Sequence, residues 1–250
     1  MGNNLQKDLN KIICGDAIEE LKKIPDESID LVLTDPPYNC GKSNFKIQEK
    51  SYKRINQSWD TMNKEEYKKL IINTFLECKR VLKYGGTVLT TGMFHNAFDT
   101  HVWLRDDVRL NFRNFITWFK PNAMPIKFAY MIGLYAYSCE YINYFTKGKT
   151  KTFNYKLAKE LNKGLQQRDL LVYKVYTDIK SGHPSQKPLS LWSYLIKIHS
   201  NKGDMILDPF LGSGTTAVAA KMLGRNYIGI EKSEEYCKIA EQRLSQQTLF

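Results

Sequence analysis

The 250-residue chain has few cysteines and no pattern among them. Its five cysteines are odd in number and widely spaced, and no Cys-x-x-Cys pair occurs. The sequence therefore indicates neither a zinc site nor a disulfide framework. Reduced thiols in a cytosol-like compartment are the simplest interpretation, and we expect no metal site.

Long hydrophobic runs are also missing. No apolar stretch is long enough to span a membrane, and the N-terminus is polar and charged, without the apolar segment of a signal peptide. These absences predict a cytoplasmic protein with no membrane partner. The hydrophobic content of 42% is ordinary, and a chain of this length can bury a substantial core, as one large domain or one domain with an insertion.

Acidic residues are scarce relative to basic ones, since 37 Lys and Arg stand against 26 Asp and Glu, a net charge of +11. Such an excess suits a polyanionic partner, although solvated surface lysines produce the same balance. Residues 120–180 carry eleven Lys and Arg, four Asp and Glu, and eleven aromatic residues. Basic and aromatic residues interleaved in this way are typical of nucleic-acid surfaces, so we expect an inserted target-recognition region at 120–182. Some of its rings must be core, because residues 141–145 are typical of a strand.

A second basic segment, residues 40–60, is rich in Lys, Ser, Asn and Gln and is predicted to be a loop. As a mobile lid it would help to hold nucleic acid, whereas a plain surface connection explains it equally well. The helix that follows is predicted to begin at Asn63, with Glu66 completing a capping box, and to end at Gly85-Gly86. We further expect a strand at 87–91 and helices at 96–105 and 112–119.

The stretch Leu31-Val32-Leu33-Thr34 is predicted to be a buried strand, and it runs into Asp35-Pro36-Pro37-Tyr38. The two prolines end the strand because they cannot donate to a sheet ladder. A carboxylate oxygen and a nearby backbone carbonyl can together accept both hydrogens of one NH2 group. The Tyr38 ring offers a flat face on which a planar base could stack. A plain turn, with Asp35 as a cap and Tyr38 packed inward, is the alternative interpretation.

A glycine-rich turn follows another predicted strand near the C-terminus. Residues 205–208 form the strand, and Gly212, Gly214 and Ala217 keep the G-x-G-x-x-[GA] spacing that opens a helix. The next strand ends in Glu231, at the distance where a ribose-binding carboxylate is found in such units. The chain after the glycine turn is too short to build a sheet, so the N-terminal strands must complete the sheet. This brings Asp35 beside Gly212 at a topological switch point. The predicted fold is α/β, with a doubly wound, mostly parallel sheet.

With these motifs the chain resembles the β-class amino-group DNA methyltransferases. The match consists of Asp35-Pro36-Pro37-Tyr38, then the segment from His183 to Pro188, and then Asp208-Pro209-Phe210-Leu211-Gly212-Ser213-Gly214-Thr215-Thr216, in the order of that class. The resemblance implies a Rossmann-like methyltransferase fold, with 1–119 and 183–250 as catalytic domain. It also implies transfer of a methyl group from S-adenosylmethionine to the exocyclic N6 of adenine in DNA after base flipping.

Specific roles follow from the same resemblance. Asp35, Pro36, Pro37 and Tyr38 would be catalytic, with the amine held by Asp35 and the Pro36 carbonyl. Ser185 stands where Thr is more usual, which keeps the hydroxyl.

DNA would be bound mainly through 120–182 and 40–60, and a homodimer and a cognate restriction endonuclease are compatible partners. The cofactor-binding residues that the resemblance implies are Asp16, Asp35, Ser185, Lys187, Asp208, Phe210, Gly212, Ser213, Gly214, Thr215, Thr216 and Glu231.

Several alternatives differ in what they leave unexplained. The N4 amine of cytosine would need the same two acceptors as the N6 amine of adenine. Members of the family with Asp at the first position of the motif more often methylate adenine. RNA or protein amine methylation shares the chemistry, usually with the cofactor loop first. A C5-cytosine methylase would need a nucleophilic cysteine, customarily after proline, and no Pro-Cys occurs. A nicotinamide oxidoreductase leaves the Asp35 motif unexplained, and a non-catalytic nucleic-acid-binding protein would carry degenerate motifs.

Overall fold

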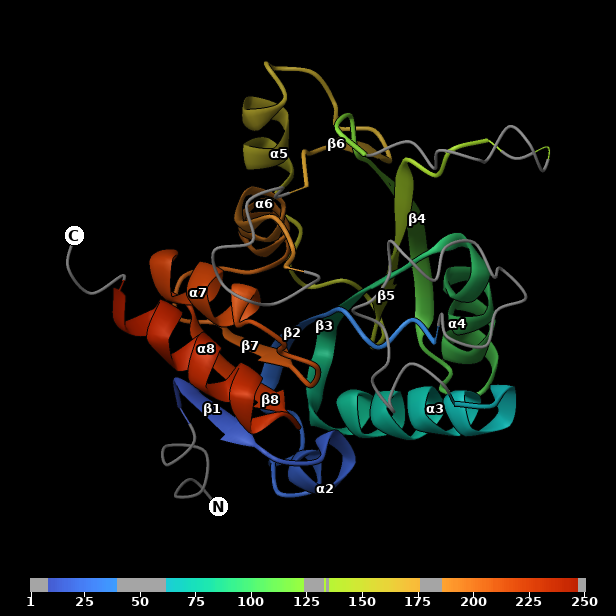
Figure 1. Ribbon diagram of the computed structural model, residues 1–250. Coiled ribbons are helices and arrows are strands. Elements are labelled where there is room, and N and C mark those ends of the chain that lie inside the picture. The colour runs from blue at the N-terminus through green and yellow to red at the C-terminus, as the bar shows by residue number, and fades with distance from the viewer. Residues whose placement is uncertain (1–8, 40–61, 124–132, 134, 176–185, 247–250) are drawn as a thin grey trace.

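The computed structural model describes residues 9–39, 62–123, 133, 135–175 and 186–246 (Figure 1). The basic segment 40–60 and Ser185 lie outside these ranges. None of the helices within them combines the length and the apolar character needed to cross a membrane.

In the described part of the chain, eight strands form one sheet in the order β1-β8-β7-β2-β3-β5-β4-β6. The first five strands in this order run parallel to their neighbours, β5 is antiparallel to β3 and β4, and β6 is parallel to β4. The mostly parallel sheet expected from the sequence is confirmed. The strands are β1 (Lys11–Cys14), β2 (Ile29–Thr34), β3 (Leu82–Gly92), β4 (Asn111–Phe119), β5 (Cys139–Thr146), β6 (Leu170–Val172), β7 (Met205–Asp208) and β8 (Asn226–Glu231).

Helices cover both faces of this sheet, as a doubly wound fold requires (Figure 1). The side chain of Val32 lies in a core with α2, α3 and α4, whereas Leu31 and Leu33 lie in a second core with α6, α7 and α8. This alternation explains why β2 is apolar on both faces. The helices are α2 (Ala17–Leu21), α3 (Lys64–Val81), α4 (Phe94–Asp106), α5 (Tyr155–Leu161), α6 (Leu189–His199), α7 (Thr215–Met222) and α8 (Glu234–Gln246).

The start of α3 is the one expected from the sequence. The Asn63 side chain accepts from the Glu66 backbone N–H at 2.9 Å, and the Glu66 carboxylate accepts from the Asn63 N–H at 3.0 Å. The expected end at Gly85-Gly86 is wrong, because Leu82 is already extended and pairs with Ile29 of β2.

The helix expected at 112–119 is also wrong, because these residues belong to strand β4. They pair antiparallel with β5 along their length. Phe115, Ile116, Thr117 and Trp118 are aromatic or β-branched, and such side chains fit the pleated surface of a sheet better than a helix.

Strand β5 lies inside the range 120–182, where we expected an insertion. It is central to the sheet, between β3 and β4, and Ile142 and Phe145 are fully buried. Part of this range is therefore sheet core, and the segments on either side of β5 are what remains for a recognition region.

The order of the strands reverses between β2 and β7. These two strands are neighbours, with Leu31 opposite Ile206 and Val32 opposite Leu207. From β2 the chain continues through α3 to β3 on one side, and from β7 through α7 to β8 on the other. Asp35 and the glycine turn therefore leave adjacent strands at the same edge, where ligands bind in open α/β sheets.

Candidate active site

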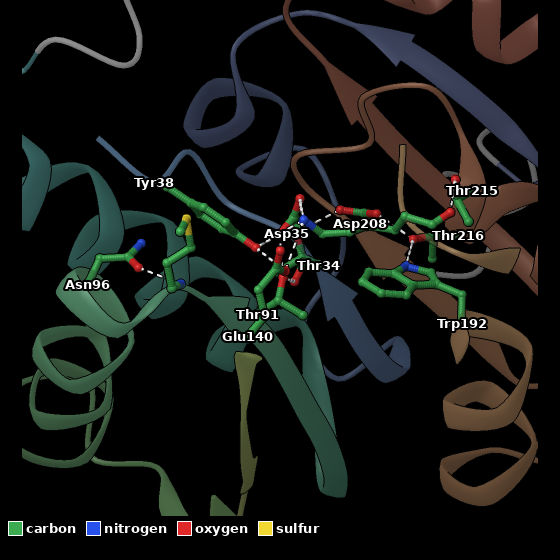
Figure 2. A network of polar contacts seen from close by, with 12 residues as sticks. Thr34, Asp35, Tyr38, Thr91, Asn96, Glu140, Trp192, Asp208, Thr215 and Thr216 are labelled. Carbon is green, nitrogen blue, oxygen red and sulfur yellow. Dashed lines mark hydrogen bonds and ion pairs between the residues drawn. The ribbon is translucent and has the colours of Figure 1, made fainter. Parts of the chain in front are cut away.

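Asp35 follows the last residue of β2, and three donors meet its carboxylate (Figure 2). The Tyr38 hydroxyl donates to Oδ1 at 2.6 Å, and the Thr91 hydroxyl of β3 donates to the same oxygen. The Lys187 ammonium lies 2.7 Å from Oδ2. The segment before α6 thus reaches the end of β2, and the two strand-end motifs form one site.

A second carboxylate, that of Glu140 on β5, closes this group. Glu140 Oε2 lies 2.9 Å from the Tyr38 hydroxyl, whose single proton serves either this oxygen or Asp35, and 3.3 Å from Lys187 Nζ. Its other oxygen is 3.1 Å from Lys120 Nζ. We call Asp35, Tyr38, Lys120, Glu140 and Lys187 the acid–lysine cluster. It holds two acids and two lysines around one phenol, drawn from separate segments of the chain.

Opposite charges keep the buried ions of this cluster charged. Burial alone lowers the pKa of Lys187, but the Asp35 and Glu140 carboxylates outweigh it, so this pKa lies above its ordinary value. Burial raises the pKa of Glu140, but Lys187 and Lys120 outweigh it, so the net shift is downward. Burial and the two carboxylates raise the pKa of Tyr38, which therefore stays a neutral phenol at physiological pH.

Lys187 lies with the catalytic residues. Besides its bond to Asp35, its ammonium donates to the Tyr38 hydroxyl at 3.0 Å and lies 4.8 Å from the centroid of the Tyr38 ring. The sequence places Lys187 among the cofactor-binding residues, and a contact with the cofactor stays a prediction. The backbone carbonyl of Lys187 does reach the glycine turn, where the Thr215 hydroxyl lies 3.5 Å away.

The glycine loop, residues 208–214, joins β7 to α7. Gly212 and Gly214 have φ of 55° and 84°, in the left-handed region that favours glycine. A Cβ on Gly214 would lie 2.7 Å from the Ala240 Cβ of α8, closer than side chains pack. The loop therefore needs glycine both for its backbone conformation and for the approach of α8.

The Asp208 carboxylate lies beneath this loop and joins it to β2 (Figure 2). Oδ1 accepts from the Thr34 hydroxyl at 2.6 Å and the Phe210 N–H at 3.1 Å, and Oδ2 accepts from the Thr216 hydroxyl at 2.5 Å. The Trp192 indole N–H completes the chain by donating to Thr216 Oγ1 at 2.9 Å. Burial raises the pKa of Asp208 to about 7, although its hydrogen bonds oppose the shift. A direct contact of this carboxylate with a cofactor stays a prediction.

Glu231 ends β8 beside the same loop. Its carboxylate accepts from the N–H groups of Gly212 and Ser233, both at 2.8 Å. A carboxylate has about four acceptor positions, so two remain for the hydroxyls of a ribose. Asp16, the N-cap of α2, follows β1, whose Cys14 is paired with Glu231. The ribose contact predicted for Glu231 and the cofactor contact predicted for Asp16 stay predictions.

Hydroxyl groups of the loop are held by an arginine that the sequence did not reveal. Arg243 of α8 donates to the backbone carbonyl of Ser213, to Ser213 Oγ at 2.9 Å and to Thr215 Oγ1 at 3.3 Å. Two glycines, hydroxyls fixed by Arg243 and two acids make a cradle into which the polar end of a small ligand fits.

Five polar residues of the site were missed from the sequence: Thr34, Thr91, Lys120, Glu140 and Arg243. One signal was available for Glu140, which is the single charged residue of the stretch 139–145. An acid in a buried strand needs a cationic partner, so it indicates lysines nearby. Nothing in the sequence says which lysines these are.

Comparison with protein families supports what this geometry suggests. The model of the N6/N4 DNA methylase family, described as DNA methylase, matches residues 29–242. Type II methyltransferase M.HinfI of Haemophilus influenzae is 36% identical over 264 aligned residues, covering 98% of this chain and 70% of that protein. Type II methyltransferase M2.DpnII of Streptococcus pneumoniae is 37% identical, covering 94% and 90%.

Solved structures agree on the fold. The crystal structure of the M1.HpyAVI–SAM complex superposes with a TM-score of 0.70 at 28% identity, covering 94% of this chain and 98% of that one. The PvuII DNA methyltransferase, which is cytosine-N4-specific, gives a TM-score of 0.75 at 21% identity, covering 93% and 85%. At that identity the second likeness shows the fold alone.

Proposed function

The chain belongs to the N6/N4 DNA methylase family and is an S-adenosylmethionine-dependent DNA methyltransferase, and we propose that its target is the N6 amine of adenine. The observation that carries methyl transfer to an exocyclic amine is the position of Asp35. It leaves β2 next to the strand that carries the glycine loop, and Thr34 and Asp208, the last residues of the two strands, are hydrogen-bonded at 2.6 Å.

The Asp35 carboxylate and the Pro36 carbonyl accept the two hydrogens of the target amine. An aromatic amine is a poor nucleophile because its lone pair is delocalised into the ring, and acceptors that hold both hydrogens favour a tetrahedral nitrogen with a free lone pair. When the nitrogen has gained the methyl group it must lose one proton, and Asp35 is the acceptor already bonded to it.

The glycine loop and Glu231 bind the cofactor beside this amine. S-adenosylmethionine supplies an electrophilic methyl group on a positively charged sulfur. Gly212 and Gly214 let the ligand approach the backbone, and the free acceptor positions of Glu231 receive the ribose hydroxyls. Because both loops open on one edge of the sheet, a methyl group held by the glycine loop would lie beside an amine held by Asp35, as direct transfer requires.

The target base must leave the double helix to reach this edge. The Asp35 side chain is only 21% exposed, and an amine inside a base pair cannot approach a carboxylate so deeply placed. Tyr38 provides the ring on which the extrahelical base stacks, which is typically worth about 1–3 kcal/mol.

Adenine is favoured over cytosine because Asp opens the motif at position 35. The test is to incubate the purified protein with tritiated S-adenosylmethionine and unmethylated genomic DNA, digest the DNA to nucleosides and identify the labelled product. We expect N6-methyldeoxyadenosine. Label in N4-methyldeoxycytidine would move the target to cytosine, and label only in an RNA or protein acceptor would contradict methylation of DNA.

Recognition of a specific sequence is proposed for the described parts of 120–182 outside β5. The segments before Cys139 of β5 and after Val172 of β6 lie at the same end of the sheet as Glu140, and the exposed Tyr135 and Lys174 belong to them. Because the relatives are named type II methyltransferases, we also propose a restriction-modification role with a cognate endonuclease.

A homodimer is proposed from the resemblance alone, and light scattering of the free protein tests it.

A further inference from the structure

Glu140 lies outside every motif of the sequence, yet it contacts three other members of the acid–lysine cluster. It is 8% exposed, on a strand held on both sides by β3 and β4. Its Oε1 binds Lys120 at 3.1 Å, and its Oε2 lies 2.9 Å from the Tyr38 hydroxyl oxygen and 3.3 Å from Lys187 Nζ. A rigid strand thus presents a buried anion to a catalytic tyrosine and to the lysine beside Asp35.

Both oxygens of Asp35 are already engaged. Oδ1 lies within hydrogen-bond distance of the Tyr38 and Thr91 hydroxyls, and Oδ2, the oxygen that these hydroxyls leave open, receives Lys187 at 2.7 Å. The Lys187 ammonium also lies 4.8 Å from the centroid of the Tyr38 ring, so it is held at the carboxylate proposed for the target amine and beside the ring proposed for the target base. The amine and Lys187 therefore compete for Asp35.

Lys187 cannot simply be released from Asp35. It is 7% exposed, and a buried ammonium without a partner is strongly unfavourable. Glu140 Oε2 is the other carboxylate within reach, at 3.3 Å compared with 2.7 Å to Asp35. If the Lys187 ammonium moves by less than about one ångström, its shorter contact becomes the one with Glu140 and its longer contact the one with Asp35. A movement of this size is within ordinary side-chain motion.

We propose that Glu140 is a positioning residue, which takes over the Lys187 ammonium when the target amine binds Asp35. The inference rests on the proposed function, because it assumes that Asp35 binds an amine. Two acids and two lysines balance in the cluster, and Lys120 keeps Glu140 fixed on its far side. The exchange therefore moves a cation between two anions, so that both lysines stay paired with Glu140 and the Asp35 carboxylate keeps hydrogen bonds from Thr91 and from the amine.

The test replaces the charge of Glu140 and keeps its shape. In Glu140→Gln the only carboxylate left for Lys187 among the described residues is that of Asp35, so the lysine stays there and competes with the amine. We expect the single-turnover rate of methyl transfer at saturating DNA to fall about 10–100-fold. The Kd for S-adenosylmethionine should stay within about twofold, because Glu140 does not contact the glycine loop. Glu160→Gln on the exposed surface of α5 is the matched control and should leave both values unchanged.

A second substitution separates this exchange from a structural role. If Lys187 blocks Asp35 when Glu140 is neutral, then adding Lys187→Met to Glu140→Gln removes the competitor and should restore the rate at least about fivefold over Glu140→Gln alone. A further loss in the double variant would overturn the proposal, as would a wild-type rate in Glu140→Gln.

Two outcomes need a separate measurement. If the wild-type protein methylates no DNA, the proposed function fails, whatever Glu140 does. If Glu140→Gln does not fold, as judged by thermal unfolding, the wild-type complex with sinefungin and a duplex containing its mapped site is crystallised. Lys187 Nζ should then lie closer to Glu140 Oε2 than to Asp35 Oδ2, and the reverse order would overturn the proposal.

Discussion

The two halves of the active site follow neighbouring strands, but they are built differently. The glycine loop is contiguous, from Asp208 to Gly214, and its shape comes from its own backbone and its glycines. The acid–lysine cluster joins side chains from positions as far apart as Asp35 and Lys187. The loop is set by local conformation, whereas the cluster exists only when the whole sheet has formed.

This difference predicts two kinds of sensitivity. Changes in the cluster should alter the rate of methyl transfer with little effect on cofactor binding, because its charges face the target amine. Changes in the loop should alter cofactor affinity and stability together, because the backbone that binds the cofactor also packs against α8. Substitutions in each half test whether effects on the rate of methyl transfer can be separated from effects on cofactor affinity, from the largest expected effect to the smallest.

Asp35→Ala should give the largest effect and the cleanest separation. It removes an acceptor of the target amine, so methyl transfer should fall by about 10³-fold, within the range for a group that acts on the transition state. The Kd for S-adenosylmethionine should change less than threefold in calorimetric titration, and a larger change would support the cofactor contact that the resemblance also implies for Asp35. Asp169→Ala, at an exposed position, is the control. Activity above a tenth of the wild-type value would show that Asp35 does not hold the amine.

The pH dependence of stability probes the carboxylate that joins the two halves. The pKa of Asp208 is about 7 in the folded protein and about 3.8 in a free side chain, so the folded state binds more protons between these values. This contribution to stability is therefore complete below pH 3.8 and is lost as the pH rises through 7.

Asp208→Asn has no proton to lose, so it should lack this dependence. The stability of the wild type relative to this variant should fall by roughly 2–3 kcal/mol from pH 5 to pH 8 in urea unfolding. Asp169→Asn serves as the control, with a pH dependence parallel to that of the wild type. Parallel curves for Asp208→Asn would mean that the Asp208 carboxyl titrates normally.

Gly214→Ala tests the loop, and Gly203→Ala is a closely matched control. Both glycines have φ of 84°, but a Cβ at Gly203 meets nothing within 4 Å, whereas one at Gly214 meets α8. The shared backbone strain should cost each variant about 1–2 kcal/mol. Gly214→Ala should lose about 1–3 kcal/mol more through overpacking, and at least about tenfold in cofactor affinity. Equal stabilities of Gly214→Ala and Gly203→Ala would show that α8 moves to accommodate the added methyl group.

The smallest effect should come from Thr91→Val, paired with Thr90→Val. The Thr91 hydroxyl donates to Asp35, whereas the buried Thr90 hydroxyl has no hydrogen-bond partner in the described ranges. Losing a hydrogen bond to a charged group costs about 1.5 kcal/mol, so kcat should fall about tenfold in Thr91→Val. Thr90→Val should keep its activity and its stability. Equal rates for the two variants would show that Thr91 does not orient Asp35.

Features encoded by neighbouring residues were predictable from the sequence. The capping box of α3, the glycine loop with its strand and helix, and the apolar strand before Asp35 all follow from spacing and residue type. The contact between β2 and β7 also followed, because the chain after the glycine loop is too short to form a sheet. Even long-range structure is predictable where the topology leaves one solution.

Features that depend on a particular distant partner were not predictable. Lys187 was assigned to the cofactor by its motif, and its ammonium binds Asp35 because of the path of the chain into α6. Residues 112–119 were predicted to be a helix, but they pair with β5. A tertiary contact decided the position of Lys187, whereas the aromatic and β-branched residues of 112–119 already favoured a strand.

On the ribosome, β2 is made long before its partner, since 174 residues separate Thr34 from Asp208. At about 5–20 residues per second, the β2 edge waits roughly 10–35 s for β7 to appear. Until then one edge of an apolar strand is open to other chains, a known route to aggregation. A nascent chain therefore cannot modify DNA early, and expression at low temperature or with chaperones should improve the yield of folded protein.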